Sequence, residues 1–135
     1  MADKLHFSLV SPARELFSGE VDHVIAPGSD GEFGVLVNHA PFMTTLKNGV
    51  VRVEDNGETT MRLFVRGGFA DVTPAGLTIL AEEAVNLASV DAEQVGKDME
   101  ALHNQILAEG KDSGKTVALQ EEYDYLASLQ KAIAN

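Results

Sequence analysis

Apolar and polar residues alternate in short runs from Lys4 to about Ala81, and glycine or proline interrupts most of these runs. Alternation of this kind is typical of strands that bury one face, and Leu5, Phe7 and Leu9 show it most clearly. The pattern predicts short strands at 5–10, 15–17, 21–26, 35–37, 42–46, 49–54, 60–66, 68–73 and 77–81. Strands so closely spaced, with no crossover helix between them, predict an antiparallel sandwich or a flattened barrel.

Dipeptides typical of tight turns separate the predicted strands. Asn48-Gly49 and Asn56-Gly57 are strong hairpin signals, because both residue types tolerate the positive φ angles of two-residue hairpin turns. Pro27-Gly28 predicts a further turn, and Ser18-Gly19 predicts the end of the second strand. We therefore expect the runs on either side of Asn48-Gly49 to form a hairpin.

Beyond about Glu82 the apolar positions recur at helical spacing. Asp91, with Gln94 three residues later, resembles a capping box, and Gly110 is a candidate C-cap. One apolar stripe lies between these caps, and a second follows over 116–134. The stripe residues are Val95, Met99, Leu102 and Ile106, then Leu119, Tyr123, Leu126, Leu129 and Ile133. Two amphipathic helices joined by a short loop predict an antiparallel helical hairpin.

The expected fold class is therefore α+β, with two parts in the chain. We predict a β-sandwich domain over residues 1–84 and a helical hairpin domain over residues 85–135, with a hinge near 84–90. Isolated helices of this length are marginal in water, so the hairpin should pack on the sandwich or on a partner.

The stretch 26–46 holds the most unusual combination of residues in the chain. Three glycines, Gly28, Gly31 and Gly34, are spaced as if the backbone turned sharply through positive φ angles. Two carboxylates lie between them at a predicted loop tip. A second turn is predicted at 38–41, because asparagine tolerates the left-handed region and proline keeps the preceding residue extended. The stretch thus predicts an acidic tip and a polar turn on either side of a short buried strand.

The acidic composition of the chain limits the kinds of molecule that it can bind. The chain has 135 residues, with 21 acidic residues against 10 basic ones and a formal net charge of −11. Such a chain matches nucleic acid and anionic membrane surfaces poorly, so we expect protein partners with basic patches and no nucleic acid. The absence of cysteine excludes disulfides, thiolate zinc sites and a catalytic thiol. No apolar run approaches the ~20 residues of a spanning helix, so we expect no direct membrane insertion.

Candidate chemistry is sparse. His39 is the one histidine in a motif-like setting, and the other three histidines lack metal-ligand spacing. The glycine-rich tip lacks the lysine of a phosphate loop and the carboxylate count of a calcium loop. We therefore expect no cofactor, no metal and a function carried by protein contacts. Two other functions stay open: a free-standing β-sandwich ligand sensor with a helical lid, and an enzyme built on His39 with Asp30 or Glu32.

Several segments together resemble a known family. They are Val10-Ser11-Pro12, Leu16-Phe17-Ser18-Gly19, residues 28–36, Asn38-His39-Ala40-Pro41, Leu46-Lys47-Asn48-Gly49, Gly67-Gly68-Phe69 and residues 77–81. Their order and spacing are similar to those of the epsilon subunits of bacterial F-type ATP synthases, and the likeness covers nearly the whole chain. The resemblance implies a ten-stranded sandwich followed by a helical hairpin, in a non-catalytic subunit at the foot of the central stalk.

The resemblance also implies partners and contact residues. In the family the sandwich binds the gamma subunit and the ring of membrane c subunits, and it rotates with them during proton-driven ATP synthesis. By position, Ser29, Asp30, Gly31 and Glu32 fall on the ring-facing loop, and Ser11 and His39 fall at positions that face gamma. The alpha and beta subunits are implied as further partners of the hairpin. The complex implies a peripheral location on the cytoplasmic face of the bacterial inner membrane.

Two departures from the family pattern concern the hairpin. In many relatives, basic residues of the second helix meet a beta subunit and block hydrolysis, whereas here Lys115 and Lys131 are outnumbered by acidic residues. We therefore expect only weak inhibition of ATP hydrolysis. Some relatives bind ATP through a motif resembling Ile/Leu-Asp-x-x-Arg-Ala. Here Asp91 alone matches, and Gln94 replaces the phosphate-facing arginine, so we expect weak or absent nucleotide binding.

Overall fold

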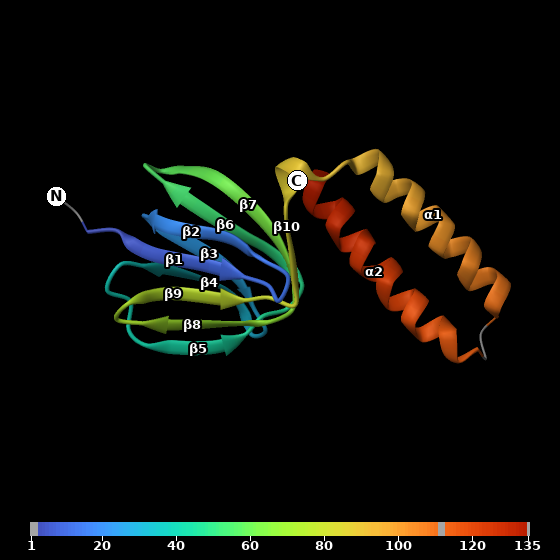
Figure 1. Ribbon diagram of the computed structural model, residues 1–135, viewed down its shortest axis with the longest axis horizontal. Coiled ribbons are helices and arrows are strands. Elements are labelled where there is room, and N and C mark those ends of the chain that lie inside the picture. The colour runs from blue at the N-terminus through green and yellow to red at the C-terminus, as the bar shows by residue number, and fades with distance from the viewer. Residues whose placement is uncertain (1–2, 111–112, 135) are drawn as a thin grey trace. The chain divides into compact units, whose positions relative to one another are not determined.

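Ten strands and two long helices form within the residues that the structure describes, 3–110 and 113–134 of a computed structural model (Figure 1). The strands are β1 (Leu5–Val10), β2 (Glu15–Val21), β3 (His23–Gly28), β4 (Gly31–Leu36), β5 (Phe42–Thr45), β6 (Gly49–Asp55), β7 (Glu58–Arg66), β8 (Phe69–Thr73), β9 (Gly76–Leu80) and β10 (Glu83–Asn86). A 3₁₀ helix, Leu87–Ser89, precedes α1 (Ala92–Glu109) and α2 (Gly114–Ala134). The predicted α+β class is confirmed.

The strands form two five-stranded sheets that pack face to face. Their orders are β2-β1-β9-β8-β5 and β10-β7-β6-β3-β4. Neighbouring strands are antiparallel in every pair of the described residues except β1 with β9, which run parallel. A parallel pair needs a long connection, and the strands from β2 to β8 supply it. The predicted sandwich is thus confirmed, with one parallel pair that the sequence pattern does not indicate.

The core between the sheets is apolar and follows the alternation in the sequence. Leu5, Phe7 and Leu9 of β1 all point inward and are at most 4% exposed. The ring of Phe17 packs on Phe7, with centroids 5.4 Å apart. Buried residues of both sheets join in one cluster. Close packing between two hydrogen-bonded sheets makes a stiff platform for the loops at its ends.

Two of the predicted turns prove to be parts of strands. The second strand does not end at Ser18-Gly19 but continues to Val21, because Gly19 pairs with Phe7 in the β1–β2 ladder. The third strand likewise continues through Pro27-Gly28. Pro27 lies beyond the last β3 residue that pairs with β6, so its missing N–H removes no hydrogen bond from that ladder.

Only one of the two predicted Asn-Gly hairpins forms. β6 and β7 meet at Asn56-Gly57, whose φ angles of 56° and 80° are the positive pair that such a turn requires. No hairpin forms at Asn48-Gly49, because β5 pairs with β8 in one sheet while β6 pairs with β3 and β7 in the other. The chain crosses between the sheets there, and Leu46 is buried in the core at the crossing.

The sandwich extends further along the chain than predicted. Ala84 is buried and pairs with Val65 of β7, so the first residues of the predicted 84–90 hinge belong to strand β10. The chain divides into two compact units, residues 1–88 and 89–135, so the division lies at residue 88 rather than at residue 84. Flexibility of the connecting segment stays a prediction.

The second unit is an antiparallel hairpin of α1 and α2 (Figure 1). Asp91 caps α1 as predicted, because its Oδ1 accepts hydrogen bonds from two backbone N–H groups of the first turn at 3.0 and 3.3 Å. Gly110, with a φ of 81°, ends the helix. α2 begins at Gly114, slightly before its predicted start at residue 116. Residues 111 and 112 of the predicted loop lie outside the described residues.

A charged cluster ties the start of β1 to two other parts of the sandwich. Lys4 Nζ lies 2.7 Å from Asp55 Oδ1 and 3.5 Å from Asp22 Oδ1. The backbone N–H of Asn56 donates to Asp22 Oδ2 at 2.7 Å, and this hydrogen bond lowers the pKa of Asp22 below its ordinary value. The hydrogen bond to Asp55 raises the pKa of Lys4. The cluster therefore joins the β2–β3 corner to the β6–β7 hairpin.

We expect the contribution of Asp22 to stability to depend on pH. Because its pKa is lowered in the folded state from 3.8, the charged carboxylate stabilises the fold above that ordinary value, and this contribution is lost as the pH falls through the folded pKa. Asp22→Asn should therefore reduce the free energy of unfolding at about pH 7 and have a smaller effect at about pH 2. Urea unfolding of both proteins measures the two differences. Equal differences at both pH values would contradict a role for the charge.

Candidate functional site

The β3–β4 hairpin carries the acidic tip at its turn. Gly28 pairs with Gly31 at the end of the ladder, which leaves Ser29 and Asp30 as the exposed turn residues. The backbone N–H of Ser29 donates to the Thr45 carbonyl at 3.0 Å, and the two hydroxyls lie 2.6 Å apart. The tip is therefore fastened to the end of β5 in the opposite sheet.

The three glycines of this stretch serve two different purposes. Gly31 takes a positive φ of 133°, as predicted. The same prediction is wrong for Gly28 and Gly34, which are required for close contact instead. A Cβ on Gly28 would lie 2.7 Å from the carbonyl oxygen of Gly31, and one on Gly34 would lie 2.5 Å from His23 Nε2. The hairpin therefore tolerates no side chain at either position without a shift.

The two carboxylates of the tip have different surroundings. Glu32 accepts hydrogen bonds from both terminal nitrogens of Arg52, at 3.2 Å from Nη2 and 3.4 Å from Nη1. Arg52 lies on β6 opposite Ile25, and Glu32 lies on β4 opposite Pro27, so the ion pair crosses over β3. Asp30 makes no hydrogen bond or ion pair with any residue in the described part of the chain.

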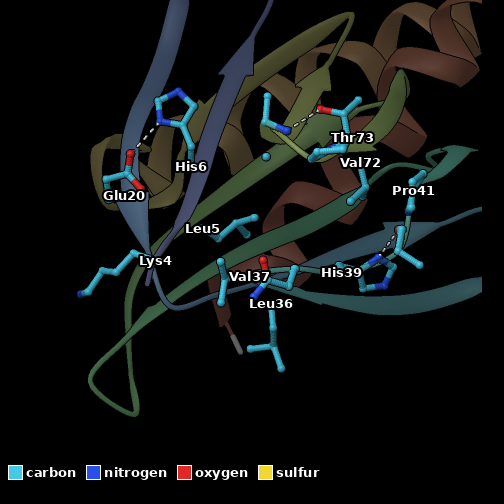
Figure 2. A pocket seen from close by; sticks show the side chains of 15 residues that line it. Lys4, Leu5, His6, Glu20, Leu36, Val37, His39, Pro41, Val72 and Thr73 are labelled. Carbon is cyan, nitrogen blue, oxygen red and sulfur yellow. Dashed lines mark hydrogen bonds and ion pairs between the residues drawn. The ribbon is translucent and has the colours of Figure 1, made fainter. Parts of the chain in front are cut away.

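The second predicted turn follows β4 and carries His39. Asn38 has a φ of 65°, as predicted, and the His39 N–H donates to the Leu36 carbonyl at 3.2 Å. The imidazole of His39 (Figure 2) bonds within its own turn, where Nδ1 donates to the carbonyl of the following residue, Ala40, at 2.7 Å. The ring also lies edge-on to Phe42, with centroids 6.2 Å apart. His39 is thus held by local contacts.

His39 borders an open cavity of about 490 Å³ at one end of the sandwich (Figure 2). On the β1–β2 side the cavity holds the pair of His6 Nδ1 and Glu20 Oε1, 3.2 Å apart. The β8–β9 turn, 73–76, closes the other side. The lining mixes polar side chains with apolar ones.

The enzyme hypothesis finds no support in this geometry. His39 follows the end of β4, whereas Asp30 and Glu32 lie at its start, so the strand separates the histidine from both carboxylates. General base catalysis requires such groups to converge. Within residues 3–110 and 113–134, no cluster of three or more histidine, aspartate or glutamate side chains could hold a metal ion.

Ser11 lies beside an apolar row on the outer face of the first sheet. Val10 of β1 pairs with Leu80 of β9, and Leu80 pairs with Phe69 of β8, so the three align across the sheet. Phe69 is 37% exposed and Leu80 is 44% exposed. With Ser11 they line a shallow groove of about 480 Å³. The row therefore exposes apolar side chains from three neighbouring strands on one face of the sheet.

Sequence reasoning missed this apolar row, although a signal exists. Leu77 and Ile79 occupy the buried phase of β9, so Leu80 is an apolar residue on the outward phase. Val10 breaks the alternation of β1 in the same way. The structure places the row and Ser11 near the beginning of β8, whereas the cavity beside His39 lies at the end of that strand.

The hairpin holds the one residue that matches the family's nucleotide motif. The Asp91 carboxylate serves as the cap of α1, and the side-chain amide of Gln94 donates to Asp98 Oδ1 at 2.9 Å. Leu107 and Val117 are strongly exposed beside the loop that joins the two helices.

Among the described residues, no helix combines the length and apolar character needed to cross a membrane.

The sandwich matches a family model described as "ATP synthase, Delta/Epsilon chain, beta-sandwich domain" over residues 4–87. An ATP synthase epsilon chain of Hyphomonas neptunium is 63% identical over 135 residues, which is 100% of both chains. An ATP synthase epsilon chain of Caulobacter vibrioides is 69% identical over 85 residues, which is 63% of this chain and 98% of the relative. The Caulobacter relative is therefore little longer than the sandwich segment.

A solved structure supports the fold independently. A chain of the mitochondrial ATP synthase of Euglena gracilis superimposes with a TM-score of 0.74 at 21% identity, covering 99% of this chain and 81% of that one. At that identity the match concerns the fold alone. The family model and the full-length relative together identify the chain as a member of the ATP synthase epsilon chain family.

Proposed function

We propose that this chain is the epsilon subunit of the central stalk of an F-type ATP synthase and couples the gamma subunit to the c-subunit ring during proton-driven ATP synthesis. The observation that carries the proposal is the 63% identity to an ATP synthase epsilon chain over the whole length of both chains. The Euglena assembly contains F1 and a c-ring, which agrees with gamma and the ring as partners. The subunit acts through contacts, and catalysis belongs to other subunits of the complex.

The outer face of the first sheet is the proposed gamma surface. The row of Val10, Phe69 and Leu80 offers apolar area beside Ser11, and burying exposed apolar area drives association. His39 is proposed as a second contact at the other end of the same sheet, because Phe42 and Met43 expose further apolar surface next to its turn.

The β3–β4 tip, Ser29–Glu32, is proposed as the ring contact. It is exposed, acidic and fastened to β5, so it presents charge to a basic loop without moving far from the sheet. We propose accordingly that the chain lies peripherally on the cytoplasmic face of the bacterial inner membrane, where the ring's polar loops would be within its reach.

The hairpin is proposed as a regulatory appendage and a weak brake on ATP hydrolysis, with the alpha and beta subunits as its partners. The Caulobacter relative supports the view that the sandwich alone suffices for coupling, since that epsilon chain is about the length of the sandwich segment. The acidic residues of α2, Glu121, Glu122 and Asp124, are a poor electrostatic match for acidic groups on a catalytic subunit.

Leu80→Asp should weaken binding of the full-length chain to purified gamma by about tenfold or more, because a charge in the apolar groove would have to be desolvated. Val117→Asp is the matched control, since it places the same charge on an exposed apolar residue of the hairpin. Titration calorimetry gives both affinities. Wild-type chain that fails to bind gamma would refute the proposed function, and equal losses in the two variants would refute this surface.

Deletion of residues 89–135 should leave coupling intact and raise ATP hydrolysis by the reconstituted catalytic head less than about twofold, because few basic groups on α2 can dock on an acidic partner. Steady-state hydrolysis with full-length and truncated chain measures the difference. A several-fold rise would identify the hairpin as a strong brake.

The isolated chain should bind ATP weakly or not at all. Asp91 is already engaged in capping, and Gln94 supplies no positive charge for a phosphate. Calorimetry with MgATP tests this expectation, and Gln94→Arg provides the informative comparison because it restores the arginine of the nucleotide motif. Micromolar affinity in the wild-type chain would contradict the prediction.

A further inference from the structure

The geometry points to different roles for the two carboxylates of the acidic tip. Arg52 forms an ion pair with Glu32 and neutralises its charge, so that Asp30 is the carboxylate that attracts a basic group of the c-subunit ring. The inference rests on the proposed function, since it assumes that the tip faces the ring. It assigns Arg52 the role of charge partner of Glu32.

Glu32 is already paired with Arg52 in the free chain. Both terminal nitrogens of Arg52 reach this carboxylate, at 3.2 and 3.4 Å, which is the two-pronged geometry that suits guanidinium and carboxylate. The side chains of Arg52 and Glu32 are 35% and 54% exposed, so the pair is reachable by a partner but already formed in the free chain. An incoming cation would therefore have to share Glu32 with Arg52.

The registers of β3 with β4 and of β3 with β6 bring Glu32 and Arg52 together. Glu32 faces Pro27 across the β3–β4 ladder, and Arg52 faces Ile25 across the β3–β6 ladder. Pro27 and Ile25 are two residues apart and therefore share a face of β3. Glu32 and Arg52 thus meet above the same face of the sheet, on strands held by backbone hydrogen bonds. The position of the ion pair is set by the sheet and not by the loop.

Asp30, by contrast, has no bonding partner for its carboxylate among the described residues. It occupies the exposed turn itself, and no described residue forms a hydrogen bond or an ion pair with its carboxylate. Because Arg52 compensates the charge of Glu32, Asp30 carries the uncompensated negative charge of residues 29–32. A basic group that approaches the tip can therefore pair with Asp30 directly, whereas at Glu32 it would meet a carboxylate already paired with Arg52.

The pairing also predicts what a change at Glu32 alone would do. Glu32→Gln would leave Arg52 without its partner beside a surface meant for a basic group. The resulting repulsion would resemble the loss of a direct Glu32 contact. Removing both members of the pair avoids this effect, because it leaves the net charge of the tip unchanged.

The test uses the full-length chain with an epsilon-depleted catalytic head and membranes that hold the ring. The amount of chain needed to restore ATP-driven proton pumping gives an apparent affinity at low and high ionic strength. Asp30→Asn should weaken this affinity about threefold to tenfold at low salt, with a smaller effect at high salt, as expected for loss of an exposed charge contact.

The double substitution Glu32→Gln with Arg52→Gln should weaken the affinity less than Asp30→Asn does, because it leaves the net charge unchanged. Arg52→Gln alone should bind equally or more tightly, because it frees the carboxylate of Glu32. Glu58→Gln is the control for net charge, since Glu58 lies at the opposite end of the second sheet, beside the β6–β7 turn. Thermal unfolding of each variant confirms that the fold is retained.

Two results would overturn the inference while leaving the proposed function standing: a loss in the double variant as large as in Asp30→Asn, or an effect of Asp30→Asn no larger than that of Glu58→Gln. Weaker binding by Arg52→Gln alone would also overturn it, because Arg52 itself would then face the partner. Failure of the wild-type chain to restore pumping would instead refute the proposed function.

Discussion

Burial of one apolar layer between two five-stranded sheets is the constraint on which the other features of the first unit depend. Because side chains alternate across a strand, fixing the inward residues also fixes the outward ones. Leu77 and Ile79 face the core, so Leu80 must face outward, next to Phe69. The apolar row beside Ser11 is therefore as firmly placed as the core.

The same constraint places the turns. β3 and β4 enter the core through Val24 and Val35, which pair with one another, so the tip at Asp30 emerges at the end of their shared ladder. The backbone N–H of Ser29 in this turn donates to the Thr45 carbonyl of the other sheet. The N–H of the next residue after Thr45, Leu46, donates to the Gly68 carbonyl. A contact made at such a tip transmits force to the whole sandwich with little local deformation. This stiffness suits the proposed coupling of two rotating partners.

The sequence was informative where a local signal coincides with the tertiary structure. The Asp91 cap, the Asn56-Gly57 turn and the buried phase of β1 each depend on near neighbours, and all three form as predicted. Asn48-Gly49 carries an equally good hairpin signal, but burial of Leu46 directs the chain across the core to the other sheet.

Long-range register explains the features that sequence reasoning could not supply. The Glu32–Arg52 pair joins residues of β4 and β6, which come together only because β3 lies between these two strands in the second sheet. Strand order is not written in any local pattern, so this contact follows from the fold. The acidic tip could be found from the sequence, whereas the difference between its two carboxylates could not.

The proposed function requires two surfaces of the sandwich to meet two different partners. The chain contains no cysteine, so a single substitution gives a thiol that is unique within this chain. Asp30→Cys and Ser11→Cys can each be introduced into the assembled ATP synthase and treated with a short thiol-directed photo-crosslinker. We expect position 30 to crosslink to a c subunit and position 11 to crosslink to gamma. Crosslinks in the reverse order, or both positions joining the same subunit, would contradict it.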